Sequence, residues 1–71
     1  MDIQQQRDKI GGRIKELRLK MGLSQDIMSK KANLSFQTIS KIESGATLNP
    51  TIDAVKKIAN VLETSFDDLM R

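Results

Sequence analysis

The chain has 71 residues, 38% of them hydrophobic, and its 12 Lys and Arg against 9 Asp and Glu give a formal charge of +3. That length suits a single domain, residues 1–71, whose core is marginal alone, so a homodimer would extend it. Because the sequence contains neither Cys nor His, it lacks the commonest zinc ligands and the usual neutral-pH catalytic groups, and we expect no enzyme, metal or other cofactor.

The first predicted helix carries an apolar residue every three or four positions, which places these residues on one face. They are Ile10, Ile14, Leu17 and Met21. Gly22 follows directly and suits the left-handed conformation that ends many helices. Gly11 and Gly12 weaken the start of this helix, each by about 1 kcal/mol relative to Ala. Residues 1–9 form an N-terminal extension, and the sequence leaves open whether they add helical turns or fray.

Two short helices are predicted next, over residues 25–32 and 36–44. Each follows a serine, Ser24 or Ser35, whose hydroxyl can cap the first turn. Asn33 stands between them, where a left-handed residue suits a sharp turn. A connection this short makes the two helices cross steeply, which is the geometry of a helix-turn-helix.

Within this unit, the small Ser29 allows the two helices to approach closely, and Gly45 ends the second one. In the first helix Ile27 and Met28 are expected to face a core, and the apolar positions of the second helix are Phe36, Ile39 and Ile42.

Two further helices are predicted after Gly45. Asn49-Pro50 reads as a cap followed by proline at the first helical position. The apolar repeat behind it is Ile52, Val55, Ile58, Ala59 and Leu62. Ser65 to Asp68 fits a capping box in which Asp replaces the usual Glu or Gln, and it opens a short last helix. Five helices without a strand pattern predict an all-α fold.

The spacing of these signals matches a known family through most of the chain. The matching segments are Ile14-Lys15-Glu16-Leu17-Arg18, Gly22-Leu23-Ser24-Gln25, Leu34-Ser35, Ile39-Ser40-Lys41-Ile42-Glu43-Ser44-Gly45, Pro50-Thr51-Ile52 and Ile58-Ala59. Over residues 10–70 the chain resembles the lambda repressor-like (Cro/XRE-type) helix-turn-helix family. The resemblance implies a compact five-helix DNA-binding domain with its helix-turn-helix at about 25–44. Two positions depart from the family's pattern, since Ser29 stands where Ala is usual and Asn33 where Gly is usual.

The resemblance implies base contacts from the start of the second helix of the motif, by Ser35, Phe36, Gln37 and Lys41. Their chemistry suits the major groove, since Gln37 can pair with adenine and Lys41 with guanine. Phe36 could pack on a thymine methyl group or, alternatively, be a core aromatic.

The resemblance also implies contacts to DNA phosphates, which position a protein without reading sequence. The implied residues are Gln25, Thr38, Ser44, Thr47, Asn49 and Arg13. Gln25 would in addition brace a residue on the next helix. For Asn49 the capping role is the stronger reading, and a solvated surface charge is the alternative for Arg13. Arg18 and Glu43 match positions that form a structural ion pair, so Arg18→Ala should loosen the domain.

We therefore expect a sequence-specific DNA-binding transcriptional regulator, a repressor rather than an activator, that binds operator half-sites as a homodimer through the major groove. The charge distribution agrees, because residues 1–45 carry nine basic and five acidic side chains whereas residues 46–71 carry three and four. The alternative is an antitoxin or anti-repressor, a protein-interaction module with the same fold.

The expected partners are double-stranded DNA and a second copy of the chain, with no membrane and no small-molecule ligand. No apolar stretch approaches the roughly 18–20 residues of a membrane span, and the polar N-terminus is no signal peptide, so we expect a cytoplasmic protein. The C-terminal residues expected at the dimer interface are Leu69, Met70 and Phe66. Leu69 and Met70 are favoured because a monomer would leave the last residues partly exposed, whereas Phe66 also suits the monomer core.

Overall fold

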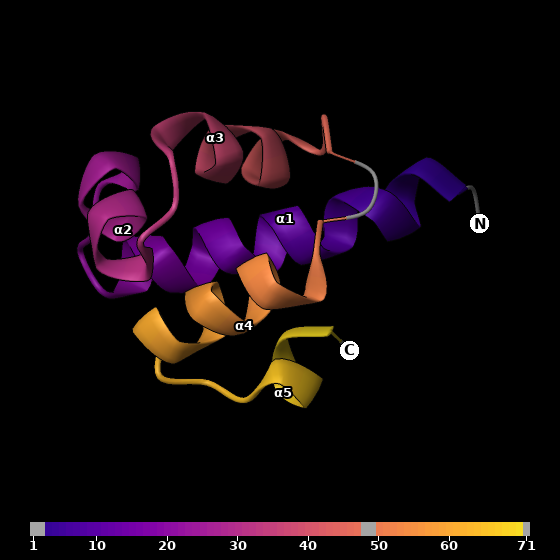
Figure 1. Cartoon of the computed structure of the whole chain (residues 1–71). Helices are drawn as coiled ribbons and strands as arrows, with labels where there is room; N and C mark the ends of the chain where they lie inside the picture. The colour runs from indigo at the N-terminus through magenta and orange to yellow at the C-terminus, as the bar shows by residue number, and fades with distance from the viewer. Residues whose placement is uncertain (1–2, 48–49, 71) are drawn as a thin grey trace.

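The computed structural model describes residues 3–47 and 50–70, and over these residues the chain forms five α-helices and no strand (Figure 1). The helices are α1 (Ile3–Lys20), α2 (Gln25–Ala32), α3 (Phe36–Ser44), α4 (Ile52–Val61) and α5 (Phe66–Met70). The predicted all-α class is confirmed, and α1 begins at Ile3, so residues 3–9 of the N-terminal extension add helical turns. None of the described helices is both long and apolar enough to cross a membrane.

The boundaries of α2 and α3 are the predicted ones. The Ser24 hydroxyl accepts a hydrogen bond from the Ile27 amide at 3.1 Å, and the Ser35 hydroxyl accepts one from the Thr38 amide at 3.1 Å. Asn33 ends α2 with φ 57°, in the left-handed region that Asn tolerates. These signals act within three or four residues, which is why they can be read from the sequence.

The start of α4 differs from the prediction. Thr51 is the N-cap, because its hydroxyl accepts a hydrogen bond from the Ala54 amide at 3.1 Å and its backbone is extended. Pro50 therefore precedes the cap, and its assignment to the first helical position is wrong. Asn49, the residue predicted to cap, lies outside the described residues.

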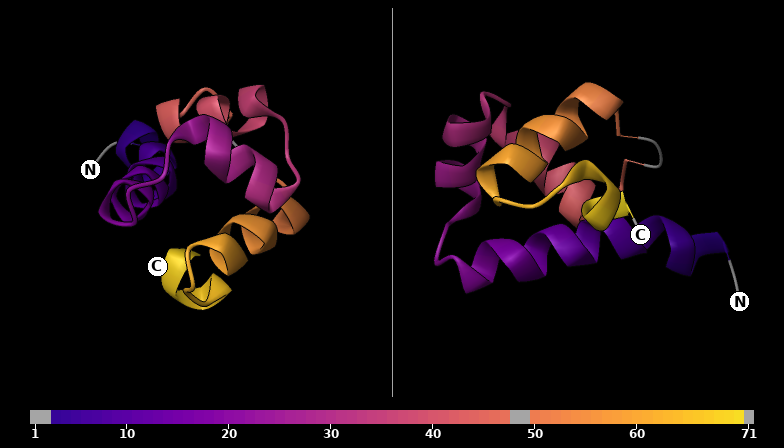
Figure 2. Two further views of the ribbon diagram at one scale, coloured as in Figure 1. Left: turned by 90° about the vertical axis from the view of Figure 1, so that its left-hand side faces the viewer. Right: turned by 90° about the horizontal axis from the view of Figure 1, so that it is seen from below.

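The helices surround one core. α3 packs against α1 and α2, α4 packs against α2, and α5 packs against α1 and α4. Figure 1 and the left view of Figure 2 place α5 across the molecule from α3. The buried residues at the centre are Ile14, Met28, Ile39, Ile42, Val55, Ile58, Ala59, Leu62 and Leu69. The arrangement leaves the side of α3 that faces away from α1 and α2 open to solvent.

Three apolar residues predicted to face the core are instead exposed. Ile27 is 45% exposed, because the buried face of α2 is formed by Met28, Ser29 and Ala32, and Ile27 points away from that face. Met21 follows the end of α1 and is 41% exposed, while Ile52 in the first turn of α4 is 63% exposed. Periodicity predicted the faces of these helices but not where the core ends.

Candidate nucleic-acid interface

The exposed face of α3 is polar apart from one aromatic ring. Ile39 and Ile42 anchor the opposite face, since they are 0% and 3% exposed. Phe36 is 45% exposed, and Gln37 and Lys41 are exposed as well. The reading of Phe36 as a core aromatic is therefore wrong.

The side chains on this face enclose a shallow hollow of about 300 Å³, lined by Phe36, Gln37, Ser40 and Lys41. Ser40 was not among the predicted contacts, although it stands three residues after Gln37 and four after Phe36. That helical spacing was the signal that could have found it. The hollow offers an amide, a hydroxyl, an ammonium group and an aromatic ring side by side.

A second hollow, of about 420 Å³, lies between α3 and the start of α4. Thr38 and Lys41 line it from α3, Thr47 from the loop, and Pro50 and Thr51 from the segment before α4. The structure therefore brings the predicted residues Thr38 and Thr47 together beside Lys41. Thr51, also unpredicted, contributes a hydroxyl that already caps α4.

The hydroxyls at the two ends of α3 make local hydrogen bonds. Ser35 and Thr38 share one between their side-chain oxygens at 2.8 Å. Ser44 donates to the Lys41 carbonyl at 3.2 Å and accepts from the Ala46 amide at 3.3 Å. Each hydroxyl thus stabilises a helix end while remaining at the surface.

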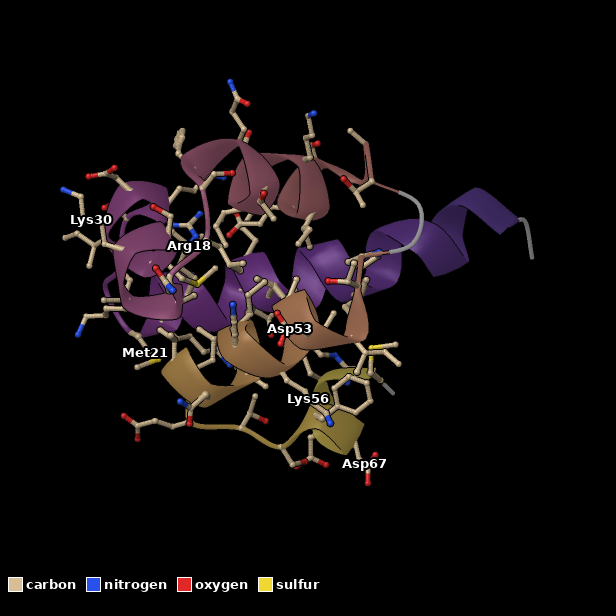
Figure 3. All side chains as sticks on the ribbon, in the orientation of Figure 1. Arg18, Met21, Lys30, Asp53, Lys56 and Asp67 are labelled. Atoms are coloured by element: carbon tan, nitrogen blue, oxygen red, sulfur yellow. The ribbon has the colours of Figure 1, made fainter. Side chains whose placement is uncertain are left out.

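Behind this face, one buried carboxylate joins three helices. Arg18 of α1 donates to Glu43 of α3 through Nε at 2.7 Å and through Nη2 at 3.0 Å. The side chains are only 7% and 2% exposed, and Arg18 lies where α1, α2 and α3 meet (Figure 3). Gln25, the first residue of α2, donates from Nε2 to Glu43 at 3.0 Å. The ion pair implied by the resemblance is present, and Glu43 is the residue that Gln25 braces.

Arg13 does not join the α3 face. Its Nη1 donates to the backbone carbonyl of Asp68 in α5 at 2.6 Å. Because α5 lies across the molecule from α3 (Figure 2), the expected phosphate role of Arg13 gives way to a structural one. A guanidinium near the end of a helix satisfies carbonyl groups that lack partners within it.

The three residues expected at the dimer interface differ in exposure. Leu69 is 1% exposed and belongs to the core, so the expectation that a monomer leaves it partly exposed is wrong. The reason is the short turn before α5, which folds this helix back against α1 and α4. Phe66 is half-buried against the core, and Met70 is 51% exposed.

Comparison with known proteins gives the class of this chain. The Helix-turn-helix family model matches residues 14–69, so the chain belongs to the helix-turn-helix family. This agrees with the Cro/XRE-type resemblance seen in the sequence.

Among curated proteins, the chain is similar to the HTH-type transcriptional regulator SinR of Bacillus subtilis (strain 168). The two are 34% identical over 61 residues, which cover 86% of this chain and 55% of SinR. The chain thus spans about half the length of this relative. An uncharacterized HTH-type transcriptional regulator of Archaeoglobus fulgidus is 37% identical over 57 residues, which cover 80% of each protein.

Solved structures agree with the sequence comparison. The N-terminal DNA-binding domain of SinR from Bacillus subtilis matches with a TM-score of 0.87 at 33% identity, over 90% of this chain and 93% of that one. SinR in complex with DNA matches with a TM-score of 0.84 at 34% identity, over 87% and 98%. A SinR–SinI protein complex matches with the same TM-score over 86% and 59%. The fold is that of the SinR N-terminal domain.

Proposed function

We propose that this protein is a sequence-specific DNA-binding transcriptional regulator, and a repressor, that inserts α3 into the major groove. The observation that carries the proposal is the exposed polar face of α3, which lies opposite the buried apolar face of the same helix. The similarity to SinR, which has been crystallised with DNA, supports it. A groove about 12 Å wide admits a helix of this kind.

The residues proposed to read bases are those of the α3 face. Gln37 presents an amide that matches adenine, and Lys41 an ammonium group that matches guanine. Phe36 offers an apolar edge for a thymine methyl group, and the exposed Ser35 a hydroxyl. Ser40 extends this set because it lines the same hollow.

Phosphate contacts are proposed on both sides of this face. Thr38 and Thr47 flank Lys41 in the second hollow, and Ser44 lies at the end of α3. Gln25, at the start of α2, is proposed to contact a phosphate as well. Asn49, outside the described residues, is proposed on the resemblance alone. Arg13 is left out because its guanidinium is turned toward α5.

Selection of binding sites from random DNA tests the proposal, and we expect a motif to be enriched. Gln37→Ala and Lys41→Ala should then each cost about 1–3 kcal/mol on the selected site and relax its base preference. Lys56→Ala is the matched control, because this exposed lysine lies on α4, away from the α3 face (Figure 3). Failure to enrich any motif contradicts the proposal, and equal losses on selected and random DNA would limit both residues to backbone contacts.

We propose further that the regulator binds DNA as a homodimer through the side formed by α5. Met70 is the exposed apolar residue there, with Phe66 half-buried beside the core. One small domain makes few contacts, so two copies on two half-sites would supply affinity and specificity.

The alternative function is a module whose target is another protein, such as an antitoxin or anti-repressor. The exposed Phe36 favours it, since aromatic side chains are enriched in protein interfaces, and a SinR–SinI complex is known for the relative. Salt dependence separates the two functions. DNA binding should weaken steeply between roughly 50 and 200 mM salt because neutralised phosphates release counterions. Binding that is independent of salt over this range would favour a protein target.

A further inference from the structure

Lys41 is shared by the two hollows on the α3 side of the molecule. The hollow of about 300 Å³ on the exposed face, whose lining includes Gln37 and Ser40, is here called the base-side hollow. The hollow of about 420 Å³ between α3 and α4, whose lining includes Thr38 and Thr47, is called the phosphate-side hollow. Of the described residues, only Lys41 lines both.

The helical spacing explains why one side chain reaches both hollows. Gln37 lies four residues before Lys41 and Thr38 lies three residues before it, so both are its neighbours on the surface of α3. A long side chain in a helix takes a χ1 of about 180° or about −60°, and in both rotamers it extends back over the preceding turn. The Lys41 ammonium can therefore lie beside Gln37 in one hollow or beside Thr38 in the other, without any change in the main chain.

The described part of the protein does not hold the ammonium in either place. Lys41 is exposed, and none of the ion pairs between described residues includes it. An ammonium group is a compact charge with three rotatable donors, and it does not require the planar geometry of a guanidinium. Its geometry therefore suits both a base edge and a phosphate, so the DNA decides between them.

The two hollows offer the ammonium different acceptors on DNA. In the base-side hollow it meets the edge of a base, where guanine presents two acceptors but thymine also presents a methyl group. In the phosphate-side hollow it lies among hydroxyl groups. The Thr51 hydroxyl accepts from the Ala54 amide at 3.1 Å, so its own proton can still be donated to a phosphate. Every sequence has a phosphate, whereas only some sequences place a guanine opposite Lys41.

We propose that Lys41 alternates between two contacts according to the DNA sequence. On non-specific DNA it binds a backbone phosphate in the phosphate-side hollow, and on the operator it turns to guanine in the base-side hollow. This inference rests on the proposed function. An ammonium pressed against a base without an acceptor would lose hydration and gain no hydrogen bond, so on other sequences the phosphate is the better partner. Lys41 thus adds affinity on any DNA and specificity only at the operator.

The free protein provides the first test. In NMR spectra of the wild type, the three-bond couplings at the Lys41 Cβ should report an average over both χ1 rotamers. A single rotamer would fix the ammonium in one hollow, and it overturns the proposal whatever the protein does with DNA.

The second test is a pair of double-mutant cycles, each measured on the selected site and on a mixed-sequence duplex. Lys41→Ala and Thr47→Val should be coupled by about threefold or more on mixed-sequence DNA and should be additive on the selected site. Lys41→Ala and Ser40→Ala should show the opposite pattern. None of the three residues is buried, so the variants should keep the fold. Any other pattern, such as coupling to the same partner on both duplexes, overturns the proposal.

The third test is the salt dependence of binding. On mixed-sequence DNA, Lys41→Ala should reduce the slope of log affinity against log salt by about 0.9, because one phosphate is no longer neutralised. On the selected site the reduction should be clearly smaller, because there the ammonium binds an uncharged base. Lys56→Ala is the matched control: this exposed lysine lies on α4, away from the α3 face (Figure 3), and the variant should leave both slopes unchanged. Equal reductions for Lys41→Ala on both duplexes overturn the proposal.

Failure of this inference is distinct from failure of the proposed function. If the wild type binds both duplexes but Lys41 has the same partner on each, the alternation fails and the proposed function stands. If the wild type binds no duplex at low salt, the proposed function fails, and the alternation fails with it.

Discussion

At the scale of single residues, Gly11 is where the backbone of α1 meets that of α3. A Cβ at this position would contact the carbonyl oxygen of Ile42, and it would lie 3.0 Å from the carbonyl oxygen of Glu43. Backbone atoms cannot move aside as a flexible side chain can. A Cβ added to Gly12, one residue later, would meet nothing within 4 Å. Two adjacent glycines in one helix therefore have different reasons to be there.

Gly11→Ala should lower the free energy of unfolding by roughly 1–3 kcal/mol, because α1 and α3 must separate to admit the methyl group. Gly12→Ala should raise it by about 0.5–1 kcal/mol, because Ala loses less backbone entropy in a helix. Urea denaturation followed by circular dichroism measures both. Equal effects of the two substitutions would contradict the close approach of α1 to α3.

At the scale of elements, two helices end on residues that are not glycine yet have positive φ. Asn33 closes α2 at φ 57°, and Glu63 follows the end of α4 at φ 57°. Asn adopts the left-handed conformation more readily than other side chains, whereas Glu has no such advantage. Asn33 is thus well suited to the end of α2, whereas the backbone of Glu63 after α4 is strained.

Asn33→Ala should destabilise the protein by about 1 kcal/mol, since the left-handed conformation costs an ordinary residue roughly 1–2 kcal/mol. Glu63→Gly should stabilise it by up to about 1 kcal/mol, less the extra entropy that Gly has in the unfolded chain. Thermal unfolding checks both signs. A Glu63→Gly protein with a lowered Tm would show that Glu63 contributes contacts that outweigh its backbone strain.

At the scale of the whole molecule, different side chains are exposed on the α3 side and on the opposite side, which α4 and α5 form. The α3 side presents Gln37 and Lys41, while the side with α4 and α5 carries Lys56 and Asp67, both labelled in Figure 3. A twofold interface on the α5 side would leave both recognition helices free. It would also have to place them about one DNA turn, roughly 34–36 Å, apart.

The homodimer can be tested through Met70 without disturbing the core. Met70→Glu should convert a dimer into a folded monomer in sedimentation experiments at tens of micromolar, because two carboxylates would face each other across a twofold axis. Ile27→Glu is the matched control, since Ile27 is 45% exposed against 51% for Met70 and lies on α2. Leu69 is unsuitable for this test, because a charge at a 1% exposed core position would unfold the monomer.

A wild-type protein that sediments as a monomer at these concentrations contradicts the dimer. A Met70→Glu variant that still dimerises would place the interface elsewhere on the molecule.

The sequence by itself determined the helices and the helix-turn-helix, because caps and turn residues act on neighbours three or four positions away. Ser24, Ser35 and Asn33 take the predicted roles for that reason. Only the tertiary structure decided which apolar residues meet the core and which polar groups meet each other. Leu69 is buried, and Arg13 bonds a carbonyl 55 residues away. Such contacts depend on how the helices cross, which the periodicity of a single helix does not contain.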